Sequence, residues 1–179
     1  MDRVKTALFD ILAPRIQGTH FLDLFAGTGS IGIEALSRGA AEATFIELDP
    51  EALRCIRENL AITGFTSKSV VVRSDAFAYL ERAHESGRRF DIVYLAPPQY
   101  HGLAARALAQ TDAAPVTELG GLVIAQVHPR ERSDLDALTL SRLHRVDERR
   151  YGSTLLAFFS HQESREGSAR NERNEGNVP

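Results

Sequence analysis

Residues 22–36 read LDLFAGTGSIGIEAL, and this stretch decides the fold that we expect. Its apolar start predicts a short buried strand, and its second half predicts a helix. Between the two, Gly27, Gly29 and Gly32 form a G-x-G-x-x-G pattern. Glycines at such positions allow a tight turn and let a ligand approach the backbone without meeting a Cβ atom. This order of elements predicts a Rossmann-like binding loop, a pattern that dinucleotide sites and S-adenosylmethionine sites share.

Two carboxylates beside the loop favour one of these ligands. Glu47 follows Gly27 by 20 residues and ends the next predicted strand, where a carboxylate can accept hydrogen bonds from a ribose diol. Asp23 stands just before the loop, where it would repel a pyrophosphate. S-adenosylmethionine has no phosphate and carries an ammonium and a sulfonium, so a nearby carboxylate suits it. We therefore predict an S-adenosylmethionine site, and a P-loop is excluded because no G-K-[ST] follows the glycines.

Asp75 begins the helix after the third predicted strand, and two interpretations of it stay open. Its side chain can hydrogen-bond the amine of an adenine, with Phe77 nearby, or it can cap the helix and nothing more. The predicted cofactor-binding residues lie in the loop and at the ends of the next two strands: Asp23, Phe25, Gly27, Gly29, Glu47, Leu48, Asp75 and Ala76.

Strand and helix patterns alternate along the chain, which predicts a parallel α/β sheet with right-handed crossovers. The last two strands lack a helical pattern between them, so we expect a hairpin that adds an antiparallel strand. Helices are predicted at 1–13, 30–38, 50–63, 76–84 and 103–110, and strands at 20–25, 43–48, 70–73, 90–95, 121–127, 140–145 and 154–159.

The length of 179 residues has room for one domain, which we place at 1–160. From residue 161 the sequence is almost entirely polar and is predicted to be a disordered tail, 161–179. The lone Cys55 excludes a disulfide framework and indicates a reducing compartment. No apolar run approaches the roughly 20 residues that span a bilayer, and the N-terminus does not resemble a signal peptide. We therefore predict a cytoplasmic protein without membrane contact.

The overall charge gives little information about the substrate. A net charge of −3 and a pI near 6.1 are not typical of a stand-alone nucleic-acid-binding protein. Arginines do gather locally, for example at 142–150. The six histidines show no metal-ligand spacing, and we predict no metal site.

Residues 90–100 read FDIVYLAPPQY and place two prolines just beyond a predicted central strand. Ligands of open α/β sheets bind at the carboxyl ends of such strands. Pro97 and Pro98 have no N–H group and keep the backbone extended, which leaves carbonyl oxygens free to face a ligand. An amine that is to be methylated needs acceptors for its protons, and rigid carbonyls provide them by position alone. Tyr100 is placed to stack on a flat base.

These motifs together resemble the RsmD-like family, the 16S rRNA guanine-N2 methyltransferases. The resemblance covers residues 2–159 and rests on DRVKTALFDIL, LDLFAGTGSIGIEALSRGA, FIELDPEALRCIRENL, FDIVYLAPP and RRYGSTLLAFF. It implies a Rossmann-like class I methyltransferase fold, with a seven-stranded, mostly parallel sheet, a C-terminal antiparallel strand and helices on both faces. It implies S-adenosylmethionine as donor, small-subunit ribosomal RNA or an assembling ribosomal particle as partner, and a monomer. The implied catalytic residues are Ala96, Pro97, Pro98 and Tyr100.

The sequence departs from the family pattern at the catalytic motif. Members carry an acidic or amide residue before the prolines and an aromatic directly after them, as in D-P-P-Y. Here Ala96 takes the first place, and Gln99 moves the aromatic to Tyr100. Loss of a positioned hydrogen-bonding group typically lowers the rate by about 10²–10³, although the carbonyl of Pro97 or the amide of Gln99 can serve instead. Members also carry a basic segment before the first helix, which this sequence does not contain.

Three alternatives follow from these observations. The enzyme can methylate another nucleic-acid or small-molecule amine, or the chain can be a weakened or non-catalytic S-adenosylmethionine-binding protein because of Ala96. A nucleotide-dependent oxidoreductase is disfavoured by Asp23 and by Pro97–Pro98.

Overall fold

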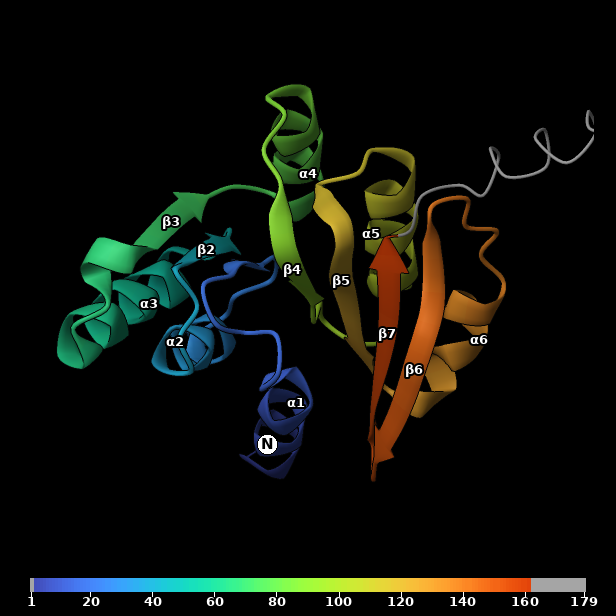
Figure 1. Cartoon of the computed structure of the whole chain (residues 1–179), viewed down its shortest axis with the longest axis horizontal. Coiled ribbons are helices and arrows are strands. Elements are labelled where there is room, and N and C mark those ends of the chain that lie inside the picture. The colour runs from blue at the N-terminus through green and yellow to red at the C-terminus, as the bar shows by residue number, and fades with distance from the viewer. Residues whose placement is uncertain (1, 162–179) are drawn as a thin grey trace, which may run out of the picture.

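A seven-stranded sheet forms the centre of the molecule, in the order β3-β2-β1-β4-β5-β7-β6 (Figure 1). The computed structural model describes residues 2–161. Strands β1 to β5 pair in parallel, and β7 pairs antiparallel with both β5 and β6. The strands are β1 (His20–Asp23), β2 (Glu42–Glu47), β3 (Ser69–Arg73), β4 (Phe90–Leu95), β5 (Thr117–Val127), β6 (Leu143–Tyr151) and β7 (Thr154–His161). The predicted class I methyltransferase fold, with its antiparallel C-terminal strand, is confirmed.

Helices cover both faces of the sheet, as expected. One apolar core joins the sheet to α1, α2 and α3, and a second core joins it to α4, α5 and α6. The helices are α1 (Asp2–Leu12), α2 (Ser30–Ser37), α3 (Pro50–Thr63), α4 (Ala76–Glu85), α5 (Leu103–Ala113) and α6 (Arg132–Asp136), with short 3₁₀ turns η1 (Thr66–Lys68) and η2 (Pro129–Glu131). Because every parallel strand enters from the same edge, the carboxyl ends of β1 to β5 meet at the opposite edge.

Local capping explains why α3 begins and ends where the sequence predicts. The Asp49 side chain accepts hydrogen bonds from the N–H groups of Glu51 and Ala52, and Pro50 occupies the first turn of α3. Gly64 ends this helix in the left-handed conformation, with φ +75°. The glycine and the aspartate therefore fix the length of the crossover between β2 and β3.

The C-terminal half differs from the prediction in its boundaries. Strand β6 begins at Leu143 rather than at residue 140, because the buried Asp112 binds the chain just before the strand. Its carboxylate accepts hydrogen bonds from the N–H groups of Ser141, Arg142 and Leu143 at 2.7–2.9 Å. The short helix α6 was not predicted. The disordered tail was predicted to begin at residue 161, but His161 is the last residue of β7. The rest of the predicted tail, 162–179, lies outside the described residues.

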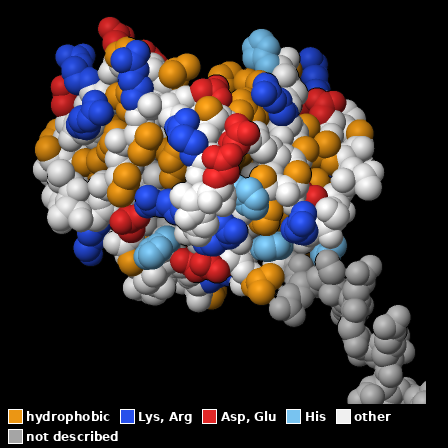
Figure 2. Space-filling view, turned by 90° about the horizontal axis from the view of Figure 1, so that it is seen from above, with side chains coloured by type: hydrophobic (Ala, Val, Ile, Leu, Met, Phe, Trp, Pro, Cys, Tyr) orange, Lys and Arg blue, Asp and Glu red, His pale blue; other side chains and the backbone are white. Residues whose placement is uncertain are grey.

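The charged surface is mixed on the side of the molecule where β4 and β5 begin. Figure 2 looks onto that side and shows Lys and Arg side chains interspersed with Asp and Glu. Within residues 2–161, no helix is both long enough and apolar enough to cross a bilayer. The same part of the chain holds no cluster of three or more His, Cys, Asp or Glu residues that could bind a metal ion.

Candidate functional site

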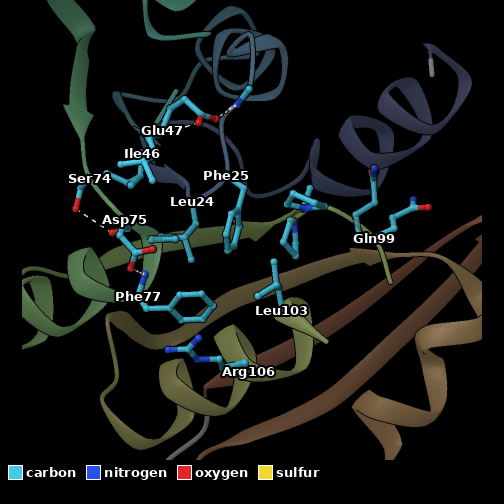
Figure 3. Close-up of a pocket in the computed structure, with 17 residues that line it drawn as sticks. Leu24, Phe25, Ile46, Glu47, Ser74, Asp75, Phe77, Gln99, Leu103 and Arg106 are labelled. Carbon is cyan, nitrogen blue, oxygen red and sulfur yellow. Dashed lines mark hydrogen bonds between the residues drawn. The ribbon is translucent and has the colours of Figure 1, made fainter. Parts of the chain in front are cut away.

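A cavity of about 710 Å³ opens at the carboxyl ends of the parallel strands. In Figure 3, Glu47, Ser74 and Asp75 lie on one side of it and Gln99 lies on the other. Most lining residues come from the turns that follow β1 to β4, and the others come from β2, β5 and the first turns of α4 and α5. They are Leu24, Phe25, Gly27, Ile46, Glu47, Leu48, Ser74, Asp75, Ala76, Phe77, Ala96, Pro97, Pro98, Gln99, Leu103, Arg106 and Gln126.

The three glycines of the loop have different roles. Gly27 adopts φ +54°, and a Cβ atom there would meet no protein atom within 4 Å. Because Gly27 lines the cavity, this empty space is space that a ligand can occupy. A Cβ atom on Gly32 would instead collide with the ring of Phe45, and one on Gly29 would lie 3.2 Å from Ile56. Gly27 therefore faces the ligand space, whereas the other two glycines allow close packing.

Glu47 is held by the backbone on both of its oxygens. Its Oε2 accepts a hydrogen bond from Gly27 N at 2.8 Å, and its Oε1 accepts from Leu48 N at 2.7 Å and Asp49 N at 3.0 Å. A carboxylate has about four acceptor sites, so one remains for a ligand hydroxyl. The loop N–H that could bind a phosphate is thus already used by a negative charge. This arrangement fits a ribose without a pyrophosphate.

The position of Asp75 is compatible with both of the roles that the sequence left open. Its Oδ1 accepts hydrogen bonds from Phe77 N and Ala78 N, both at 3.0 Å, and so caps α4. Its Oδ2 accepts no hydrogen bond from the described residues, and the side chain is exposed and lines the cavity. One carboxylate can therefore cap the helix and still accept a hydrogen bond from a ligand.

Aromatic rings form the apolar wall next to Asp75. The rings of Phe25 and Phe77 meet edge to face, with centroids 6.2 Å apart. The guanidinium of Arg106, from α5, lies 3.8 Å from the centre of the Phe77 ring (Figure 3). A cation over an aromatic face is attracted to it, so Arg106 helps to fix the ring. Arg106 was not predicted as a site residue, because nothing in the sequence pattern of α5 distinguishes this arginine from a solvated one.

Asp23 lies beneath the loop and does not line the cavity. The side chain is 1% exposed, and its Oδ2 accepts a hydrogen bond from Gly32 N at 3.1 Å. Burial raises the pKa of Asp23 to about 7, and the negative charge of Glu47 adds to the increase. The carboxyl group is therefore only partly ionised near neutral pH, and it supports the loop from beneath rather than lining the cavity.

The far side of the cavity is formed where β4 ends. Ala96, Pro97, Pro98 and Gln99 line it, with Pro97 buried and the next two residues exposed. Ala96 presents only a methyl group there. The side-chain acceptor that the family pattern places at this position is therefore absent, as the sequence indicated.

Tyr100 lies outside the lining of the cavity. It is the one non-glycine residue of the described chain with a positive φ, 68°, and its side chain is 60% exposed. Its N–H donates to Oε1 of the buried Glu131 at 2.9 Å, and its ring leans on His128 at a centroid distance of 5.3 Å. Oε2 of Glu131 also accepts from His128 N at 3.3 Å. Glu131 thus ties the turn after β4 to the end of β5.

The structure brings most of the predicted site residues together. Three predicted residues do not reach the cavity: Asp23, Gly29 and Tyr100. Long-range packing adds several side chains that the sequence analysis did not assign to the site, among them Leu103, Arg106, Gln126 and Glu131. The predicted residues that line the cavity are Phe25, Gly27, Glu47, Leu48, Asp75, Ala76, Ala96, Pro97 and Pro98.

Comparison with known proteins shows the family of the chain. The family model described as "Conserved hypothetical protein 95" matches residues 1–160. YlbH of Bacillus subtilis, named as a candidate rRNA methyltransferase, is 32% identical over 158 residues, which cover 88% of this chain and 84% of that protein. The solved structure of yhhF from Escherichia coli, described as a candidate methyltransferase, has a TM-score of 0.77 and 29% identity, covering 90% of this chain and 86% of that one.

A further relative aligns over a shorter segment. The Ribosomal RNA small subunit methyltransferase D of Escherichia coli K12 is 43% identical over 102 residues, which cover 57% of this chain and 50% of that protein. The matched segment therefore spans half of the relative's length.

Proposed function

The chain belongs to the family described as Conserved hypothetical protein 95, and from this premise we propose that it is an S-adenosylmethionine-dependent rRNA methyltransferase. Its proposed target is the exocyclic N2 amine of a guanine in small-subunit ribosomal RNA. The observation that carries the proposal is a single cavity with two carboxylates at one end and a Pro-Pro turn at the other. The names of the relatives in Bacillus subtilis and Escherichia coli agree with this activity.

The cofactor end fits S-adenosylmethionine better than a dinucleotide. Glu47 would accept a hydrogen bond from a ribose hydroxyl, and the open Oδ2 of Asp75 would accept one from the adenine amine. Leu48 and Phe77 would hold the adenine between apolar surfaces, and the space at Gly27 would admit the amino acid part. When bound, the cofactor supplies an electrophilic methyl group on its sulfonium.

The acceptor end would position the amine without a strong base. The carbonyl of Pro97 can accept a hydrogen bond from one N–H of the amine. This hydrogen bond would turn the nitrogen lone pair toward the cofactor side of the cavity. The amide oxygen of Gln99 is a second acceptor on the same turn. Fixed acceptors of this kind favour the transition state because they need no reorganisation when charge develops.

A second candidate function follows from Ala96. If the turn after β4 lacks an acceptor that the reaction needs, the chain binds S-adenosylmethionine and transfers its methyl group slowly or not at all. Transfer to another nucleic-acid or small-molecule amine is a related possibility that the same cavity allows. These functions differ in which substrate they label, and all of them bind S-adenosylmethionine.

The substrate particle, the oligomeric state and the location of the protein follow from the proposed activity. We propose that the chain acts as a monomer on small-subunit ribosomal RNA or on the assembling particle, and in the cytoplasm, where that substrate would be found. Exposed arginines of the β6–β7 hairpin, Arg149 and Arg150, stand at the same edge of the sheet as the cavity and would contact RNA phosphates.

The test is methyl transfer from labelled S-adenosylmethionine, with cofactor binding measured in parallel by calorimetry. We expect S-adenosylmethionine to bind and NADH not to bind, and label to enter unmodified small ribosomal subunits but not free nucleosides. Equal labelling of subunits and nucleosides would contradict the rRNA assignment. Binding without transfer would favour the non-catalytic function, and tight NADH binding would contradict both.

A further inference from the structure

Gln126 lines the acceptor end of the cavity. It belongs neither to the residues that would hold the cofactor nor to the Pro-Pro turn after β4. It lies on β5, next to the end of β4. Leu95 pairs with Ala125 across these two parallel strands, so the following residues, Ala96 and Gln126, stand side by side where the strands reach the cavity. Its side chain is therefore the nearest polar group on the neighbouring strand to the position where the family pattern has an acceptor.

The carbonyl end of the Gln126 amide is fixed from below. The hydroxyl of Tyr94 donates to Gln126 Oε1 at 2.5 Å, and Tyr94 is 2% exposed. Burial and the nearby charge of Asp23 hold the pKa of Tyr94 well above its usual range, so the hydroxyl keeps its proton and stays a donor. If the amide were flipped, the buried hydroxyl of Tyr94 would lose its acceptor. The orientation with Oε1 toward Tyr94 is therefore strongly favoured.

The other end of the amide faces the open cavity. Gln126 Nε2 makes no hydrogen bond with any of residues 2–161. It is also not one of the fully buried atoms without a partner, which in the described part of the chain are Tyr79 Oη and Thr117 Oγ1. Because Gln126 lines the cavity and its Nε2 is accessible and unpaired, this nitrogen is available to a ligand. The acceptor end thus offers an acceptor, the carbonyl of Pro97, and a donor, the amide of Gln126.

We propose that Gln126 is a specificity-determining residue, whose amide N–H donates to the ring nitrogen beside the amine that is methylated. This inference rests on the proposed function, because it takes a base as the ligand. In guanine the N2 amine is flanked by N3, an acceptor, and by N1–H, a donor. A carbonyl and an amide N–H side by side match the amine and N3 together. A base without an acceptor at this place would leave the donors of Gln126 unpaired, which lowers its reactivity.

Substitution at position 126 tests the donor without changing the size of the side chain. Q126E keeps an oxygen to accept from Tyr94 but replaces the N–H₂ group by a second acceptor. We expect kcat/KM for methyl transfer to guanine to fall about tenfold to a hundredfold, with unchanged affinity for S-adenosylmethionine. Q17E makes the same chemical change on an exposed side chain that hydrogen-bonds the Arg38 carbonyl and does not line the cavity, and it serves as the control.

The substrate provides the second half of the test. Small-subunit RNA is prepared with guanine, 3-deazaguanine or 2-aminopurine at the methylated position. All three keep the N2 amine, but 3-deazaguanine lacks the N3 acceptor, whereas 2-aminopurine keeps N3 and lacks O6 and the N1–H donor. The wild-type protein should lose about tenfold or more in kcat/KM on 3-deazaguanine, and Q126E should lose little further. Equal loss on 3-deazaguanine by both proteins, or an unchanged rate for Q126E on guanine, would overturn the inference.

Binding separates a failure of this inference from a failure of the proposed function. Guanosine 5′-monophosphate is titrated into the wild-type protein and into Q126E, each saturated with S-adenosylhomocysteine. Weaker binding by Q126E supports the role of Gln126 even if no RNA is methylated, in which case only the proposed activity fails. Equal binding by the two proteins contradicts the inference whether or not the wild-type protein methylates RNA.

Discussion

The two ends of the cavity are built in different ways. At the cofactor end, Glu47 and Asp75 each receive hydrogen bonds from the backbone within a few residues of themselves, and Glu47 also binds Gly27. At the acceptor end, the polar groups come from segments far apart, such as the pair Tyr94 and Gln126 and the contact from Glu131 to the turn after β4. The first end is set by local geometry, and the second depends on how β4, β5 and the following turns pack together.

This difference indicates which substitutions the chain tolerates. The local geometry of the cofactor end agrees with the family pattern, whereas the acceptor end departs from it at Ala96 and Gln99. We therefore expect changes at the cofactor end to abolish cofactor binding, and changes at the acceptor end to alter the rate or the choice of substrate while the cofactor still binds.

The largest effect is expected for Glu47→Ala. The substitution removes the acceptor for a ribose hydroxyl, a hydrogen bond to a charged group at about 2 kcal/mol. It also removes the acceptor that holds the N–H groups of Gly27, Leu48 and Asp49 in the loop, and the two losses together correspond to about 10³ in affinity. Calorimetry should show this loss of S-adenosylmethionine affinity. The exposed Glu51 on α3 supplies the control, Glu51→Ala, which should bind normally. Normal binding by Glu47→Ala would remove Glu47 from the site.

The next largest effect is expected at the other end, for Ala96→Asp. An added carboxylate beside the Pro97 carbonyl supplies the acceptor that the family pattern has, and kcat should rise by about 10². Affinity for S-adenosylmethionine should not change. Single-turnover methyl transfer to unmodified subunits measures the rate. An unchanged rate would mean that backbone carbonyls and Gln99 already supply what the reaction needs.

Gly27→Ala tests whether the ligand occupies the space that the glycine leaves. Both Gly27 and Gly18 have positive φ, and a Cβ atom on either would meet nothing within 4 Å, but only Gly27 lines the cavity. Both alanine variants should lose about 1–2 kcal/mol of stability through backbone strain. Only Gly27→Ala should also lose cofactor affinity, by about tenfold or more. Equal affinities in the two variants would contradict the assignment of this space to the cofactor.

A smaller effect is expected for Glu131→Ala. Without its carboxylate, Tyr100 loses the hydrogen bond that holds its left-handed conformation, and the turn after β4 is released from His128. The KM for the RNA substrate should rise several-fold, while the affinity for S-adenosylmethionine stays constant. A fall in cofactor affinity would show instead that Glu131 supports the whole cavity.

A further effect, on stability rather than on binding or rate, is expected at the buried Asp23. Its pKa is raised from 3.8 to about 7 in the folded protein, so between these values the folded chain keeps a proton that the unfolded chain loses. The stability that this proton provides is complete below about pH 4 and is lost as the pH rises to about 7. The difference in unfolding free energy between the wild type and Asp23→Asn should therefore fall between pH 5 and pH 7 and then level off. Denaturant unfolding at several pH values measures it, and a difference that does not vary with pH would contradict the raised pKa.

The sequence predicted the fold and the cofactor end because both depend on local patterns. The capping aspartates, Asp49 and Asp75, and the glycine loop determine nearby turns whatever the rest of the chain does. The start of β6 was misplaced because it depends on Asp112, about 30 residues earlier. Gln126 and Arg106 were missed for the same reason, since only the pairing of β5 with β4 and the packing of α5 bring them to the cavity. Asp23 was predicted to bind the cofactor, and it lies beside the loop but does not line the cavity. Its burial could not be predicted from the spacing of the motif.

The most direct test of the central claim is to locate the methyl group after reaction. Unmodified small ribosomal subunits are incubated with the wild-type protein and labelled S-adenosylmethionine, and the RNA is digested and analysed by mass spectrometry. We predict one methyl group on the N2 amine of a single guanine. A methyl group on another base or atom, or no methyl group although the cofactor binds, would contradict the claim that the acceptor end of this cavity holds a ribosomal guanine.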